Sequence, residues 1–130
     1  MRSFLGMACV AMPLVLGGCA TGEPIENVAN APAVAPSGKN LTRSDVAVAI
    51  QRAARSVGWQ LIAEGPGLFT GRLQRRHHLA IVEIEYDSTA YSIRYRDSTN
   101  LDAKNGEIHR AYNQWIENLD QAIRAELRTF

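Results

Sequence analysis

The chain has 130 residues, of which 14 are Lys or Arg and 13 are Asp or Glu, so its formal net charge is +1. This balance gives no reason to expect nucleic acid as a partner, because nucleic-acid binding needs a basic surface. After any leader segment, the length allows one compact domain and not two.

Residues 1–18 have the pattern of a secretory signal. Met1-Arg2-Ser3 is a short positive region, and the stretch from Phe4 to Leu16 is apolar. An apolar run of about a dozen residues is too short to cross a bilayer as a helix, which needs roughly 20. We therefore expect residues 1–18 to be a signal peptide that is removed from the mature protein.

The signal ends in Leu16-Gly17-Gly18-Cys19, which resembles the lipobox of bacterial lipoproteins. The resemblance implies diacylation of the Cys19 sulfur, cleavage before Cys19, and acylation of the new terminus with a chain such as palmitate. Each buried CH₂ contributes about 0.8 kcal/mol, so several chains hold a protein to a membrane more firmly than one. Ala20, in place of an Asp that favours inner-membrane retention, implies the periplasmic side of the outer membrane of a Gram-negative cell. The competing interpretation is an ordinary cleaved signal with a coincidental cysteine.

The two cysteines of the chain are Cys9 and Cys19, both at this N-terminal end. The rest of the chain therefore has no thiol for a disulfide or a thiolate metal site. A domain exported without disulfides must be held together by core packing.

Residues 19–40 predict a flexible tether that begins at the lipidated Cys19. Pro24, Pro32 and Pro36 interrupt any helix, and the small residues around them offer little surface to bury. A flexible chain of this length reaches about 25 Å. The remaining residues, 41–130, are expected to form a single α+β domain.

A helix is predicted over residues 43–57. Thr42 is a suitable N-cap, and Asp45 occupies the acidic position of a capping box. Leu41 can pack on Val46, and Gly58 suits the position after the helix.

Four strands are predicted next, over residues 59–64, 69–74, 80–86 and 91–96, because apolar and polar residues alternate in each. Short turns between them give an antiparallel meander in which Ile84 lies opposite both Phe69 and Ile93. Glu83 is expected opposite Arg94 on the other face. Gly71, inside a strand, is expected to leave room for a bulky neighbour such as Trp115 or for the close approach of a helix.

The last predicted element is a helix over residues 107–128, with apolar residues at spacings of three and four. These are Ile108, Tyr112, Trp115, Ile116, Leu119, Ile123 and Leu127. The expected fold is therefore an α+β two-layer sandwich, αββββα, with both helices on one face of a four-stranded meander. An exposed edge at the first or last of these strands could pair between copies, although the sequence does not fix the oligomeric state.

Candidate catalytic residues do not form a recognisable set. His77 and His78 are adjacent and would point to opposite faces of a strand, and His109 has Asn113 rather than a ligand one turn later. No serine lies in a G-x-S-x-G context, and Glu83 and Glu85 are expected to share a face with arginines. We therefore expect no enzyme activity, no cofactor and no metal. A hydrolytic or metal-dependent enzyme is kept as a third functional hypothesis, after the two binding hypotheses given below.

A more particular pattern is Tyr95-Arg96-Asp97-Ser98-Thr99-Asn100-Leu101 followed by Ile108-His109 and then Tyr112-Asn113-Gln114-Trp115. It resembles small uncharacterised envelope lipoproteins of Gram-negative bacteria. The resemblance implies a shared fold and an envelope location, and carries no activity. From the residues alone, Asp97, Ser98 and Asn100 suit a turn, and Asn113 is expected to tie this loop to the helix.

The open face of the predicted sheet is the candidate binding region, because apolar residues lie there among arginines. Its candidate residues are Arg72, Ile81, Arg94, Arg96, Asp97, Ser98 and Asn100. The first functional hypothesis is a non-enzymatic interaction or structural module of the cell envelope that docks an envelope protein. The alternative is a module that binds a small or polymeric anionic envelope ligand. A solvated face with ordinary exposed aliphatic residues would also explain the pattern.

Overall fold

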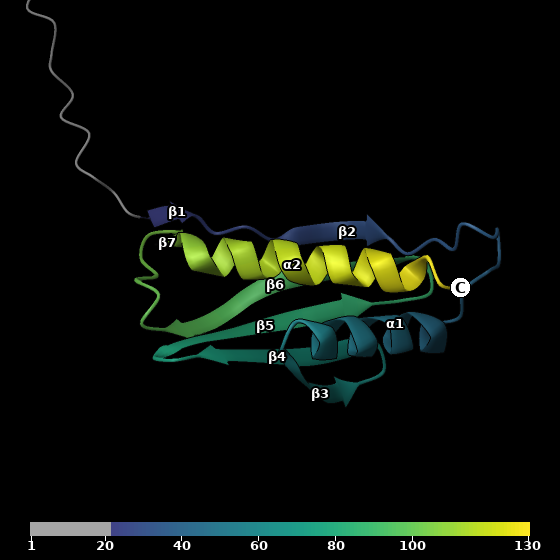
Figure 1. The fold of residues 1–130 in the computed structure, drawn as a ribbon, viewed down its shortest axis with the longest axis horizontal. Coiled ribbons are helices and arrows are strands. Elements are labelled where there is room, and N and C mark those ends of the chain that lie inside the picture. Colours follow the sequence, from purple (N-terminus) through teal and green to yellow (C-terminus); the bar gives the residue numbers. More distant parts are fainter. Residues whose placement is uncertain (1–21) are drawn as a thin grey trace, which may run out of the picture.

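The structure is a computed structural model, and it describes residues 22–130 (Figure 1). The predicted signal peptide and Cys19 lie outside the described residues. Two helices, a five-stranded antiparallel sheet and a two-stranded sheet confirm the α+β class. In chain order the elements are β1 Gly22–Pro24, β2 Val28–Pro32, α1 Arg43–Ser56, β3 Gln60–Gly65, β4 Leu68–Arg75, β5 His78–Tyr86, β6 Ala90–Thr99, β7 Glu107–His109 and α2 Arg110–Leu127.

The central sheet has the strand order β2-β6-β5-β4-β3, and β3 to β6 form the expected meander. Phe69 pairs with both Ala63 and Ile84, and Ile84 pairs with Ile93, so the predicted register is confirmed. Glu83 lies opposite Arg94, as expected. Alternation alone was sufficient here, because a slip of one residue would turn the buried side chains to solvent.

Both helices lie in front of the sheet in Figure 1, and they also contact one another. Their buried side chains pack with the inward-facing residues of the strands. The fully enclosed members include Val46 and Ile50 of α1, Val82 and Ile84 of β5, and Ile116, Leu119 and Ile123 of α2. Burial of this apolar surface is the main stabilising term of the domain, at about 25 cal/mol for each Å² removed from water.

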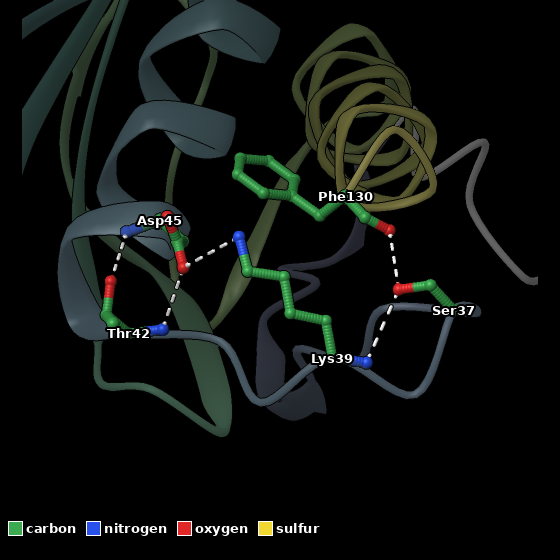
Figure 2. Close-up of polar contacts among 5 residues, drawn as sticks. All are labelled: Ser37, Lys39, Thr42, Asp45 and Phe130. Atoms are coloured by element: carbon green, nitrogen blue, oxygen red, sulfur yellow. Dashed lines mark hydrogen bonds and ion pairs between the residues drawn. The ribbon is translucent and has the colours of Figure 1, made fainter.

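The start of α1 confirms the predicted capping box. Thr42 Oγ1 accepts the Asp45 backbone N–H at 3.0 Å, and Asp45 Oδ2 accepts the Thr42 N–H at 3.0 Å (Figure 2). Lys39 Nζ lies 3.8 Å from Asp45 Oδ2 and 5.6 Å from the centre of the Phe130 ring. Ser37 Oγ donates to the Phe130 carbonyl at 3.0 Å, so the entry to α1 and the C-terminus are joined.

The expected flexible tether is wrong for most of its length, because residues 22–40 belong to the fold. β1 pairs with β7, and β2 adds a fifth strand beside β6. Ala31, Ala33 and Ala35 are buried. The small side chains that seemed to offer little to bury fit closely packed positions at the sheet edge, and Pro32 is tolerated there because an edge strand has one free side.

Two local predictions are also corrected. The last helix begins at Arg110 rather than at residue 107, because 107–109 form β7 and His109 is the N-cap, whose Nδ1 accepts the Ala111 N–H at 3.0 Å. The bulky neighbour of Gly71 is Trp59 and not Trp115. A Cβ at Gly71 would lie 3.4 Å from a ring carbon of Trp59 and 2.9 Å from a methyl carbon of Val82.

Candidate functional site

The open face is the side of the central sheet opposite α1 and α2, and no helix of residues 22–130 covers it. Cross-strand pairing places Arg72, Ile81 and Asp97 in one row. A second row joins Ile62 to Thr70, then to Glu83 and Arg94. The face is therefore a mixed surface of aliphatic and charged side chains.

The structure brings five of the seven candidate binding residues to this open face and places the other two elsewhere. Arg72, Ile81, Arg94, Arg96 and Asp97 lie there, with Arg96 at a register shift between the pairs of Ile81 and Val82.

Ser98 pairs with buried Ala80, and its Oγ lies 2.8 Å from Tyr95 Oη, so it faces the helix side. Asn100 follows the end of β6, where its side-chain amide donates to the His77 carbonyl at 2.8 Å. Ser98 therefore lies within β6 on the helix side, and Asn100 lies in the turn after β6, so neither belongs to the open face.

The arginines of the open face already have partners on the protein. Arg94 forms ion pairs with Glu85 and, at 4.0 Å, with Glu83. The hydrogen bond with Glu85 is the main cause that raises the pKa of Arg94 above its ordinary value; desolvation opposes this shift, and the charges of Glu85 and Glu83 add to it. Because its charge is matched by two carboxylates, Arg94 offers little net attraction to an anion.

The other two arginines contact neutral groups. Arg96 donates to Thr70 Oγ1 at 3.3 Å, and Thr70 in turn donates to Glu64 at 2.9 Å. Arg72 donates to Gln74 Oε1 at 3.1 Å. The contact of Arg96 with Thr70 joins β6 to β4 across β5, the contact of Thr70 with Glu64 joins β4 to β3, and that of Arg72 with Gln74 lies within β4. Each of these exposed contacts contributes little to stability on its own.

The edge strand β3 is a feature that the sequence analysis considered only as a route to dimers. It is the outermost strand on its side, so one row of its backbone groups has no partner within the sheet. Its sequence Gln-Leu-Ile-Ala-Glu-Gly contains no Pro or Lys, its register with β4 shifts only at its end, between Ala63 and Gly65, and the side chain of Ile62 is 61% exposed. Proteins commonly use Pro, Lys or bulges to protect such edges.

The opposite edge, β2, is protected in these ways. Pro32 ends the strand, and the pairing with β6 shifts register between Val28 and Ala31. Asn30 has φ of +49°, a left-handed conformation that interrupts a regular strand. In β3, by comparison, residues 60–63 pair regularly with β4, so this stretch is the more regular of the two edges.

Trp59 lies at the base of this open edge. Its ring is 4% exposed, and its Nε1 is buried with no hydrogen-bond partner among residues 22–130. A hollow beside β3 is lined by Gln51, Arg55, Trp59, Gln60 and Leu61. The side of the domain that carries β3 therefore has both an unpaired backbone edge and a recess.

The three histidines do not assemble a metal site. His78 Nδ1 lies 2.7 Å from the Asn100 carbonyl oxygen, and its ring packs 6.1 Å from that of His109 and 6.4 Å from that of Trp115. His77 is exposed on the turn. Across residues 22–130, no group of three or more His, Cys, Asp and Glu residues is placed to hold a metal ion.

A second candidate region holds the N-terminal segment, and its centre is Asn113. The sequence analysis expected this side chain to tie the 95–101 loop to the helix. Instead its Nδ2 donates to the Pro24 carbonyl at 2.9 Å and to Glu23 Oε2 at 3.2 Å, and its Oδ1 accepts the Glu26 N–H at 3.0 Å. Asn113 is 3% exposed, so these bonds are shielded from water.

Further backbone bonds hold the same segment on both sides. The Ile25 N–H donates to the Gly106 carbonyl at 2.9 Å, and the Tyr95 N–H donates to Asn27 Oδ1 at 2.9 Å. Burial, followed by repulsion from Glu117 and Glu23, raises the pKa of Glu26.

No protein-family model, curated protein or solved structure matches this chain. In the part of the chain that the structure describes, neither helix is long and apolar enough to cross a membrane.

Proposed function

We propose that the protein is a lipoprotein anchored in the outer membrane through Cys19, and that its domain acts in the periplasm as a non-enzymatic interaction module. The observation that carries the docking part of this proposal is the regular edge of β3 over residues 60–63, where Ile62 is exposed. The lipobox pattern at Leu16-Gly17-Gly18-Cys19 supports the anchoring part.

The proposed occupant of the edge is an extended segment of an envelope protein. Such a segment would add a sixth strand, and its backbone would pair with the free N–H and C=O groups of β3. Alternate side chains of the added strand would lie on the open face beside Ile62, so an aliphatic residue there would remove apolar surface from water. Backbone pairing supplies affinity, and the residue opposite Ile62 supplies specificity.

The anionic-ligand alternative is less well supported by the geometry. Arg94 is paired with Glu83 and Glu85, and Arg72 and Arg96 are engaged by neutral side chains. Protein docking at β3 leaves all of these contacts intact, whereas binding of an anion would require several of them to break.

In-cell crosslinking tests the docking proposal, with a photoreactive residue at position 62 and the matched control at position 34. Val34 is a suitable control because, among residues 22–130, it is the other large apolar side chain with high exposure, at 63% against 61% for Ile62. We expect a specific protein adduct from position 62 and none from position 34. Ile62→Lys should abolish capture, whereas Val34→Lys should not.

If position 62 forms adducts only with a second copy of this chain, the edge of β3 serves self-association and the proposal of an envelope partner is wrong. Equal adducts from both positions would contradict a dedicated edge. Mass spectrometry of the mature N-terminus tests the anchor separately: we expect a chain that begins at an acylated Cys19, and an unmodified Cys19 would refute it.

A further inference from the structure

The N-terminal segment enters the fold only a few residues after Cys19. β1 begins at Gly22, so three peptide units separate the two residues. Consecutive Cα atoms are 3.8 Å apart, and the span from Cys19 to Gly22 is therefore at most about 11 Å. This limit replaces the reach of about 25 Å expected for a tether that runs to residue 40.

Strand pairing holds the residues at which the chain enters the fold. Gly22 pairs with His109, and Pro24 pairs with Glu107, in the two-stranded sheet of β1 and β7. Asn113 then holds Pro24 and Glu26. For the span to lengthen, this pairing and these shielded bonds would have to break together.

A length of about 11 Å is comparable to the polar layer of a membrane. The hydrocarbon core of a bilayer is about 30 Å thick and the whole bilayer about 40–45 Å, which leaves about 5–8 Å for each headgroup layer. A lipidated Cys19 lies at that layer, because its acyl chains enter the hydrocarbon. Gly22 must then lie at or just above the headgroups.

We propose that the anchor end of the domain, formed by β1, β7 and residues 101–106, lies against the phospholipid headgroups, so that the domain is held at the membrane in one orientation. This inference rests on the proposed lipidation of Cys19. Residues 102–107 are exposed, and the His109 N–H donates to the Leu101 carbonyl at 2.8 Å, which places this loop beside β1 and β7.

Charge does not drive this contact. Lys104 and Arg110 at the anchor end are offset by Glu23, Asp102 and Glu107. A balanced surface has little attraction to anionic lipid, so the acyl chains impose the contact. Without acylation, the domain should therefore stay off vesicles.

The opposite end of the domain is carried away from the membrane. β5 runs from His78, beside Asn100, to Tyr86, near the turn where Ala33 donates to the Thr89 carbonyl. Its eight steps of about 3.3 Å separate the two ends by roughly 25 Å. The β3 edge lies on the far side of the sheet from β2 and stays accessible to a partner.

Site-specific quenching in vesicles tests the orientation with the full lipidated protein. Single cysteines are introduced as Ala103→Cys at the anchor end, Val34→Cys at the far end and Gln121→Cys on the outer side of α2, all at exposed positions. Each is labelled with a fluorophore in vesicles of phosphatidylethanolamine and phosphatidylglycerol that carry a headgroup quencher. The parent protein is treated with the same label as a control.

We expect quenching at position 103 to be several-fold stronger than at positions 34 and 121. An insertion of 20 Gly and Ser residues between Ala20 and Thr21 should remove the difference while membrane attachment persists. Equal quenching at all three positions without the insertion, or strongest quenching at position 121, would overturn the proposed orientation.

The parent protein reports separately on the anchor. A thioether at Cys19 blocks labelling, so a labelled parent that fails to join vesicles would refute lipidation itself and leave the orientation without its premise.

Discussion

Asn113 Oδ1 accepts the backbone N–H of Glu26 at 3.0 Å, although 87 positions separate the two residues in the chain. The opposite side of the same amide donates to the Pro24 carbonyl at 2.9 Å. One buried side chain of α2 thus satisfies a donor and an acceptor of a segment that the pairing of β1 with β7 also holds on the domain. This arrangement turns an expected tether into part of the fold.

Asn113→Ala should lower the free energy of unfolding by about 2 kcal/mol. The change removes two backbone hydrogen bonds, each with a net contribution of about 1 kcal/mol, and leaves shielded polar groups of Pro24 and Glu26 without their partner. Denaturant unfolding measures the loss. Hydrogen exchange at residues 22–27 should become faster than in the parent protein, because this segment separates first.

Gln114→Ala is the matched control, since Gln114 is the exposed neighbour on the same helix. We expect it to change the free energy of unfolding by less than about 0.5 kcal/mol. Unchanged exchange at residues 22–27 in Asn113→Ala would show that strand pairing alone holds the segment.

Much of the fold could be predicted because local signals agreed with tertiary packing. The alternation of β3 to β6 and the capping box at Thr42 depend on residues close in sequence, and both are confirmed. β2 could not be recognised in this way. Its residues are small, with no alternating apolar pattern, and its pairing depends on β6, about 60 positions later.

In the candidate site, too, the residues that follow local strand alternation could be predicted and the others could not. Strand alternation correctly placed Arg72, Ile81 and Arg94 on one face, because each follows the period of its strand. Ser98 was expected in a turn after a strand that ends at residue 96; β6 instead runs to Thr99, and the register shift at Arg96 turns Ser98 to the helix side. The open edge at β3 could be identified only once β2 was seen to cover the other edge.

Thr42→Ala should lower the free energy of unfolding by about 1 kcal/mol, because it removes the side chain that accepts the Asp45 N–H at the start of α1. Ser44→Ala serves as the control, since Ser44 is exposed and lies outside the capping box, which Thr42 and Asp45 form. Thermal or denaturant unfolding measures both variants. Equal stability of the two would mean that the box does not contribute beyond helix packing.

Gly71→Ala should destabilise the domain by about 1–3 kcal/mol through overpacking. The new Cβ would lie 2.9 Å from Val82 Cγ2 and 3.3 Å from Leu61 Cδ2, and Val82 is fully buried. Gly71→Ala combined with Val82→Ala should lose less than the sum of the two single changes, with a coupling of about 0.5 kcal/mol or more. Strict additivity in denaturant unfolding would show that the strand relaxes elsewhere.

The stability of the domain should decrease above pH 10 because of two buried tyrosines. Burial is the main cause that raises the pKa of Tyr91 and of Tyr112 above the ordinary value of 10.0, and the bond from Tyr91 Oη to Asp120 Oδ1 at 2.5 Å adds to the effect at Tyr91. The folded protein therefore keeps both protons at a pH where the unfolded chain loses them. The free energy of unfolding should fall by up to about 1.4 kcal/mol per pH unit for each tyrosine above this pH.

Phenylalanine at either position separates the two contributions. At pH 7, Tyr91→Phe should lower the free energy of unfolding by about 1 kcal/mol, since it removes the bond to Asp120. Tyr112→Phe should be neutral or stabilising, because Tyr112 Oη is buried with no hydrogen-bond partner within residues 22–130. Each single variant should remove the contribution of one tyrosine to the fall of the free energy of unfolding with pH, and the double variant should remove both contributions. Denaturant unfolding between pH 9 and pH 11.5 measures these slopes, and a double variant with the slope of the parent protein would assign the pH dependence to other groups.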